Sequence, residues 1–200
     1  LLDVLTRRGV VVSCGHTDAT AEQAHRAFDR GAATVTHLFN AMRPFGHRDP
    51  GLAGAALARD DVAVQLIVDG RHLADETVRL VWRAAAGRVA LVSDAIAAAG
   101  LGDGPTRLGG VEVDVREGVA RLADGTLAGS VQPLLGGLRR LHALGVPLAE
   151  AVGAVTSVPA RIARRPDLGT LAPGSAADVV VLDDALEVAR VLVAGETVAG

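Results

Sequence analysis

The strongest constraint on the fold is an alternation between short apolar runs and helical patterns in the first half of the chain. Each unit begins with a run of β-branched or apolar residues, continues through a polar or glycine-containing loop, and ends in a helical pattern. This alternation is typical of βα units that build a parallel sheet. We therefore predict strands at 10–14, 33–36, 62–68 and 89–93, helices at 21–29, 52–59 and 75–86, and an amphipathic helix within 1–10.

The pattern changes after residue 94. Residues 108–122 alternate around a turn at 116–118, which predicts a β-hairpin, while 134–144 and 148–162 return to helical periodicity. Three short apolar runs at 177–182, 188–193 and 197–199 predict a small β module. We thus predict two domains, residues 1–165 with a hairpin insertion at about 106–125, and residues 166–200.

Composition narrows the class of protein. Half of the 200 residues are apolar, which is enough for one sizeable core, and the net charge of -3 gives no basic excess of the kind that nucleic-acid binding requires. Cys14 is the single cysteine, so an internal disulfide and a cysteine-based zinc site are excluded. No apolar run approaches the roughly 20 residues that span a bilayer. We expect a cytoplasmic protein with neither nucleic acid nor a membrane as partner.

Polar side chains follow each of the four predicted strands: His16, His37, Asp69 with His72, and Asp94. The carboxyl ends of parallel strands meet at one edge of a sheet, where active sites of α/β folds lie. Two histidines at matching positions favour a metal site, although a catalytic zinc usually takes three protein ligands, and no third is visible. Asp94 is interpreted as a general base, with a helix N-cap as the alternative.

Three further segments are open to two interpretations each. Asp69 and His72 would contact substrate or form a solvated Asp-Gly turn. The loop at 43–50, with Arg43, His47 and Arg48, would bind an anionic substrate group or simply be solvated. The glycine-containing loop at 125–130 would offer amides to a ligand or serve as an ordinary connection.

Several segments, in order, resemble the N-acetylglucosamine-6-phosphate deacetylases of the amidohydrolase superfamily. They are GHTDAT, THLFNAM, HRDPGLAGAAL, DGRHL, LVSDAIAAAG and DGTLAGS, followed by LGTLAPGSAADVVVLD and VLVAGETV. THLFNAM and HRDPG are specific to these deacetylases, whereas the GTLAPGSAADVVVLD pattern is shared across the superfamily. The resemblance covers essentially the whole chain.

The resemblance implies an α/β fold that is the C-terminal half of a (β/α)8 TIM-type barrel of the amidohydrolase kind, with part of a small β-sandwich at the C-terminus. Such a barrel needs typically about 250 residues, and the family's glutamate metal ligand lies in the N-terminal half. We therefore expect these residues to belong to a longer protein or to a truncated one. A homodimer is also implied.

The resemblance further implies hydrolysis of the acetamide of N-acetyl-D-glucosamine 6-phosphate to acetate and glucosamine 6-phosphate, in amino-sugar catabolism. His16 and His37 match the metal ligands, with zinc the first choice and iron or another divalent metal open, and Asp94 matches the catalytic aspartate. The implied substrate-binding residues are Asn40, Ala41, Arg48, Asp69, His72, Leu127, Ala128 and Gly129.

Two alternatives remain. One is a related amidohydrolase that acts on N-acetylgalactosamine 6-phosphate or a cyclic amide, although THLFNAM and HRDPG disfavour cyclic substrates. The other is an inactive fragment that serves only in binding or assembly.

Overall fold

Four parallel strands in sequential order form the centre of the fold. In the computed structural model, which describes residues 1–199, β1 (Val12–Cys14), β2 (Ala32–Val35), β3 (Ala63–Leu66) and β4 (Val89–Leu91) lie in the order β1-β2-β3-β4. The predicted strands are therefore confirmed, each at or inside its predicted range except that β2 begins one residue earlier. β1 and β4 are the two edges of this sheet.

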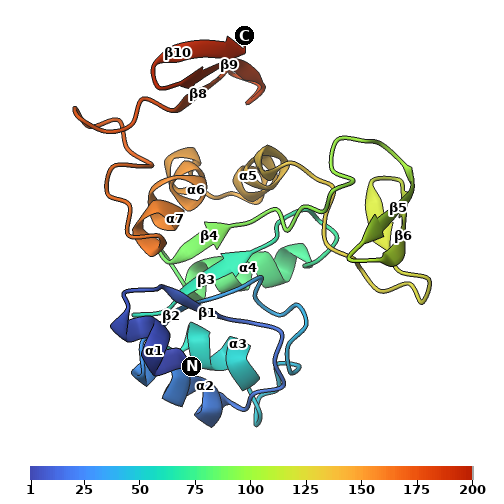
Figure 1. The fold of residues 1–200 in the computed structure, drawn as a ribbon, viewed down its shortest axis with the longest axis vertical. Helices are drawn as coiled ribbons and strands as arrows, with labels where there is room; N and C mark the ends of the chain where they lie inside the picture. The colour runs from blue at the N-terminus through green and yellow to red at the C-terminus, as the bar shows by residue number, and fades with distance from the viewer. Residues whose placement is uncertain (200) are drawn as a thin grey trace.

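Helices connect these strands and lie both below and above them in the view of Figure 1. α1 (Leu2–Arg7) precedes β1, and α2 (Ala21–Asp29), α3 (Gly51–Leu57) and α4 (Asp75–Ala84) connect the strands. α5 (Leu134–Ala143), α6 (Leu148–Val155) and α7 (Ser157–Ile162) pack beside β4. Right-handed crossovers between strands in sequential order place the connecting helices on the same face of the sheet. Within residues 1–199, none of these helices is long and apolar enough to cross a membrane.

The core lies between this sheet and its helices. Val64 and Leu66 of β3 are fully buried, whereas Ala63 and Gln65, which alternate with them, are only partly buried. The buried hydrophobic residues are almost all aliphatic, with Phe28 of α2 the one phenylalanine or tryptophan among them in residues 1–199. At β3 one face of the sheet is thus packed and the opposite face is more open, whereas all three residues of β4 are buried.

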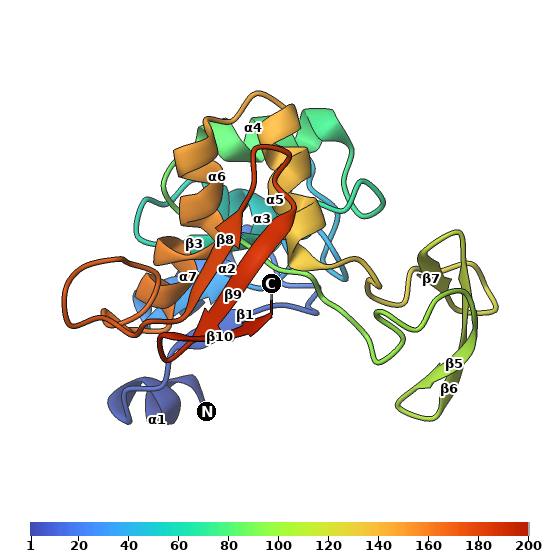
Figure 2. The same cartoon turned by 90° about the horizontal axis from the view of Figure 1, so that it is seen from above.

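A three-stranded lobe replaces the two-stranded hairpin that the sequence predicts. β5 (Gly104–Leu108), β6 (Val111–Arg116) and β7 (Val119–Arg121) form an antiparallel sheet in the order β5-β6-β7. The prediction missed β5, which turns into β6 through Gly109 and Gly110, both at positive φ. A two-residue turn of this kind favours glycine at both positions, so this pair was the overlooked signal. Figure 2 shows the lobe projecting away from the helices.

The predicted helix at 148–162 is also wrong in one respect, because it divides into α6 and α7 at Thr156. Thr156 has φ -128 and ψ -86, outside the helical region. Pro159 has no N–H to bond the Val155 carbonyl, so the helix cannot run through unbroken. Proline is tolerated in the first turn of α7, where an N–H would have no intrahelical partner.

The C-terminal strands form a separate sheet. β8 (Val179–Leu182), β9 (Val188–Val193) and β10 (Glu196–Ala199) are antiparallel in the order β10-β9-β8, which confirms the predicted β module. Figure 1 shows this sheet set apart from the four-stranded one. Val180 and Val198 are 57% and 61% exposed, so the module presents apolar side chains that residues 1–199 do not cover.

Candidate active site

His16 and His37 face one another at the carboxyl ends of β1 and β2. Their Nε2 atoms lie 2.9 Å apart, and the ring centroids are separated by 4.8 Å. His37 is 5% exposed whereas His16 is open to solvent. The structure therefore brings together the two histidines that the sequence predicts as metal ligands.

The three residues predicted to carry the chemistry share an unusual backbone conformation. His16, His37 and Asp94 have φ of 46°, 30° and 50°. Non-glycine residues seldom adopt positive φ, and such strained positions persist where the surroundings hold them and gather at functional sites. All three residues stand just after the carboxyl end of a parallel strand, His16 after β1, His37 after β2 and Asp94 after β4.

The loops that follow β1 and β2 are joined by backbone hydrogen bonds. Thr17 N–H donates to Ala41 O at 3.1 Å, and Arg43 N–H donates to Thr17 O at 3.1 Å. The guanidinium of Arg43 binds Asp18 through two nitrogens, and its third nitrogen lies 2.8 Å from Asp49 Oδ2. Arg43 is thus committed to two carboxylates of the protein, so the anion-binding interpretation of this loop now concerns the exposed His47 and Arg48.

Asp69 and His72 form a buried pair after β3. His72 Nδ1 lies 2.8 Å from Asp69 Oδ2, and the other carboxylate oxygen accepts the N–H groups of Arg71 and His72. Burial raises the pKa of Asp69, but these hydrogen bonds outweigh it and hold the pKa well below its usual range. An ionised carboxylate only accepts, so His72 Nδ1 is the donor, and a neutral His72 ring keeps Nε2 as an acceptor.

Asp94 follows β4 and contacts the loop that precedes α5. Its carbonyl accepts the N–H of Ser130 at 2.8 Å, and Ile96 N–H donates to Ser130 O at 2.9 Å. A Cβ added to Gly129 would lie 2.8 Å from Asp94 O and 3.7 Å from Asp94 Oδ2. The predicted loop at 125–130 therefore does meet the predicted catalytic aspartate.

The remaining residues predicted to contact substrate differ in their burial and hydrogen bonding. Asn40 donates its side-chain amide to the carbonyls of His37 and Leu38, and Arg48 is exposed. Leu127 is partly buried, whereas Ala128 is buried in the small core of the β5–β7 lobe and donates its N–H to Ala120 O. Ser130 lies within the predicted loop at 125–130 but was not singled out; it is 4% exposed and its hydroxyl lies 3.3 Å from Asp69 Oδ2.

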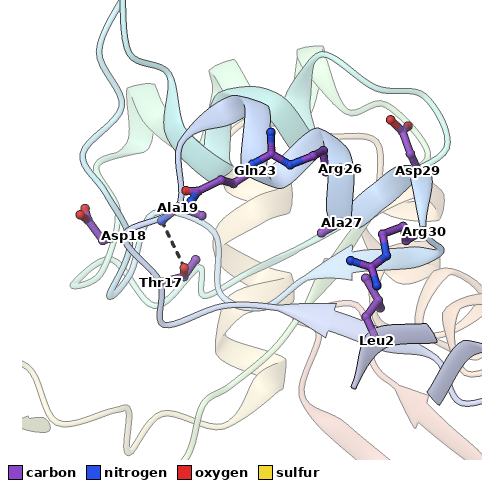
Figure 3. A pocket seen from close by; sticks show the side chains of 9 residues that line it. All are labelled: Leu2, Thr17, Asp18, Ala19, Gln23, Arg26, Ala27, Asp29 and Arg30. Carbon is purple, nitrogen blue, oxygen red and sulfur yellow. Dashed lines mark hydrogen bonds between the residues drawn. The ribbon is translucent and has the colours of Figure 1, made fainter. Parts of the chain in front are cut away.

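A separate hollow lies between α1, α2 and the loop after β1 (Figure 3). It is open to solvent, has a volume of about 750 Å³ and is lined by Leu2, Thr17, Asp18, Ala19, Gln23, Arg26, Ala27, Asp29 and Arg30. Figure 3 shows Thr17 Oγ1 accepting the N–H of Ala19 at 3.1 Å, which shapes the start of this loop. Neither His16 nor His37 lines this hollow, so it is distinct from the candidate active site.

Comparison with known proteins identifies the family. The model of the amidohydrolase family matches residues 6–198. This chain belongs to the amidohydrolase family. The N-acetylgalactosamine-6-phosphate deacetylase of Escherichia coli O157:H7 is 39% identical over 96% of this chain and 52% of the relative. The N-acetylglucosamine-6-phosphate deacetylase of Homo sapiens is 40% identical over 99% of this chain and 50% of the relative.

Solved structures confirm the α/β fold of this amidohydrolase chain. An aspartate-to-alanine variant of N-acetyl-D-glucosamine-6-phosphate deacetylase from Mycobacterium smegmatis, in complex with N-acetyl-D-glucosamine 6-phosphate, is 42% identical with a TM-score of 0.95. The match covers 100% of this chain and 54% of that one. The chain thus spans about half the length of the relatives it matches.

Amidohydrolases are generally dependent on divalent metals, and the residues present fit two positions of such a site. The two Nε2 atoms of His16 and His37 are close enough to bind one ion together. Residues 1–199 contain no group of three or more histidine, cysteine, aspartate or glutamate side chains that could hold a metal. Within the same residues, the buried Nδ1 of His37 has no hydrogen-bond partner.

Replacing Gly129 by Ala in this amidohydrolase is expected to lower the free energy of unfolding by about 2 kcal/mol and to reduce activity. Gly129 has φ 75°, and its new Cβ would press on Asp94 O and Ile96 Cγ2, both at 2.8 Å. The matched control is Gly136→Ala in α5, where a Cβ meets nothing within 4 Å and stability should stay equal or rise. Urea denaturation of both variants provides the measurement, and equal stabilities would contradict the expectation.

Proposed function

We propose that this chain is the C-terminal, chemistry-bearing half of an N-acetylglucosamine-6-phosphate deacetylase. The observation that supports it most is the paired His16 and His37, both at positive φ like Asp94, in a chain that matches such deacetylases over nearly its whole length. The proposed reaction releases acetate from N-acetyl-D-glucosamine 6-phosphate and leaves glucosamine 6-phosphate, a step of amino-sugar catabolism.

In the proposed site, His16 and His37 hold a divalent metal together with a ligand from outside the described residues. When bound, the metal polarises the acetamide carbonyl and lowers the pKa of the attacking water. Asp94 accepts the proton of that water and passes it to the departing amine, as a general base and then a general acid. Zinc suits two imidazole ligands best, and iron or another divalent ion is compatible with the same donors.

The sugar phosphate would lie between the strand-end loops. The loop with Asn40 and Ala41 and the exposed Arg48 lie on the side of β2, and Asp69 holds His72 so that its Nε2 is left as an acceptor for a sugar hydroxyl. Residues 127–129, with Leu127, Ala128 and Gly129, would approach the substrate from the side of Asp94.

We further propose that residues 1–165 are half of a (β/α)8 barrel and that 166–200 belong to a small β-sandwich. The free edges of β1 and β4 and the uncovered valines of β8–β10 support this division, because unpaired strand edges and apolar sheet faces are normally covered in native proteins. A homodimer in the cytoplasm completes the proposal.

A second substrate has support of its own. The Escherichia coli relative, 39% identical to this chain, is an N-acetylgalactosamine-6-phosphate deacetylase. The two amino sugars differ in the orientation of one hydroxyl, which a pocket that hydrogen-bonds this hydroxyl can discriminate strongly. N-acetylgalactosamine 6-phosphate is therefore the alternative substrate of the same site.

The test is acetate release by the complete gene product that carries these residues, measured with both sugar phosphates and with unphosphorylated N-acetylglucosamine. We expect a higher kcat/KM for N-acetylglucosamine 6-phosphate than for the galactose epimer, and at least about a hundredfold loss without the phosphate, since charged hydrogen bonds to an anion are worth about 1.5–3 kcal/mol each. Acetate release from neither phosphate would refute the proposal, and preference for the epimer would establish the alternative.

A further inference from the structure

Ser130 connects two parts of the proposed site that are far apart in the sequence. Its backbone N–H donates to Asp94 O at 2.8 Å, and its carbonyl accepts from Ile96 N–H at 2.9 Å. These bonds form a parallel β-bridge between Ala95 and Ser130. They fix the backbone of Asp94 in its left-handed conformation, which an isolated chain would seldom adopt.

The side chain of Ser130 makes the second connection. Its hydroxyl lies 3.3 Å from Asp69 Oδ2, the oxygen that also accepts from His72 Nδ1. The hydroxyl oxygen in turn accepts the N–H of Gln132 at 3.1 Å, which leaves its hydrogen for Asp69. Ser130 is 4% exposed, so water does not readily replace these bonds.

We propose that Ser130 is a positioning residue that fixes the position of the Asp69–His72 pair relative to Asp94. The backbone of Ser130 fixes the aspartate that moves the proton, while its hydroxyl orients the carboxylate that directs the His72 ring toward the substrate. The assignment of Asp94 and His72 to these tasks rests on the proposed function, whereas the contacts of Ser130 do not.

Ser130→Ala separates the two connections, because it removes the hydroxyl and keeps both backbone bonds. We expect KM for the sugar phosphate to rise about tenfold, the effect of one lost hydrogen bond to a charged group, while kcat changes less than about threefold. The matched control is Ser157→Ala at the start of α7, whose hydroxyl donates to Gly153 O of α6 at 3.4 Å and which should leave KM unchanged. A fall in melting temperature without a change in KM would reduce Ser130 to a structural residue and overturn the proposal.

A double-mutant cycle in the complete gene product tests the route through Asp69. In an Asp69→Asn background the hydroxyl no longer acts on a carboxylate, so adding Ser130→Ala should raise KM no further. The same tenfold rise in both backgrounds would overturn the proposal. If Ser130→Ala does not fold, Ser130→Cys provides a similar shape with a weak donor, and an unchanged KM in that variant is equally contradictory.

A readout without turnover keeps this inference separate from the proposed function. The ¹⁵N signals of the His72 ring, assigned with His72→Gln, should shift in Ser130→Ala and not in Ser157→Ala. If the unsubstituted enzyme releases no acetate, the deacetylase proposal fails while these signals still test the contact. Unchanged His72 signals in Ser130→Ala would overturn the positioning role in either case.

Discussion

Asp94→Asn is expected to lower kcat for acetate release about a thousandfold in the complete gene product, with little change in KM. The amide side chain has almost the same shape as the carboxylate but cannot accept the proton that the proposed mechanism transfers to Asp94. General acid–base catalysis contributes typically about 10²–10⁴-fold, so a loss near the middle of this range corresponds to about 4 kcal/mol of activation free energy.

The structure indicates that Asp94→Asn should leave the backbone around residue 94 unchanged. Asp94 is exposed, and the hydrogen bond from Ser130 N–H that holds it is accepted by its backbone carbonyl, which the substitution leaves in place. The matched control is Asp184→Asn in the turn between β8 and β9, which should keep the kcat of the unsubstituted enzyme. Unchanged acetate release by Asp94→Asn would remove this residue from the mechanism.

His16→Gln and His37→Gln are each expected to lower the metal content of the dialysed enzyme more than about tenfold and kcat/KM more than about a hundredfold. Replacing a residue that only hydrogen-bonds a metal ligand typically lowers metal affinity or activity about 10–100-fold. Replacing a ligand itself should lower them at least as much. Metal per chain is measured by inductively coupled plasma mass spectrometry, alongside acetate release.

The histidine variants need a control for folding and a control for the loss of a histidine outside the site. His37 is 5% exposed, so His37→Gln is compared with the unsubstituted enzyme by circular dichroism before its metal content is interpreted. His25→Gln in α2 is the matched control and should retain the metal. Full metal content in both His16→Gln and His37→Gln would show that the pair does not form the metal site.

Much of the fold could be predicted because its signals are local. The helix at α2 has the predicted bounds, and Thr20 at its start forms a capping box with Gln23 that can be read from residues three apart. The four strands were predicted from apolar runs that each stand between a loop and a helical pattern. The missed strand β5 and the break at Thr156 also had local signals, in Gly109-Gly110 and in Pro159. In both places the surrounding pattern, alternating near β5 and helical near Thr156, was a stronger signal than these residues.

The candidate site divides in the same way. The sequence alone determined that His16, His37 and Asp94 stand at strand ends, because a strand and the polar residue after it are neighbours along the chain. Only the tertiary structure decided that Ser130 reaches Asp69 across 61 positions and that Arg43 is held by Asp18 across 25. Hydrogen bonds between such distant residues follow from how the strands and loops pack, and packing leaves no periodic pattern near either partner.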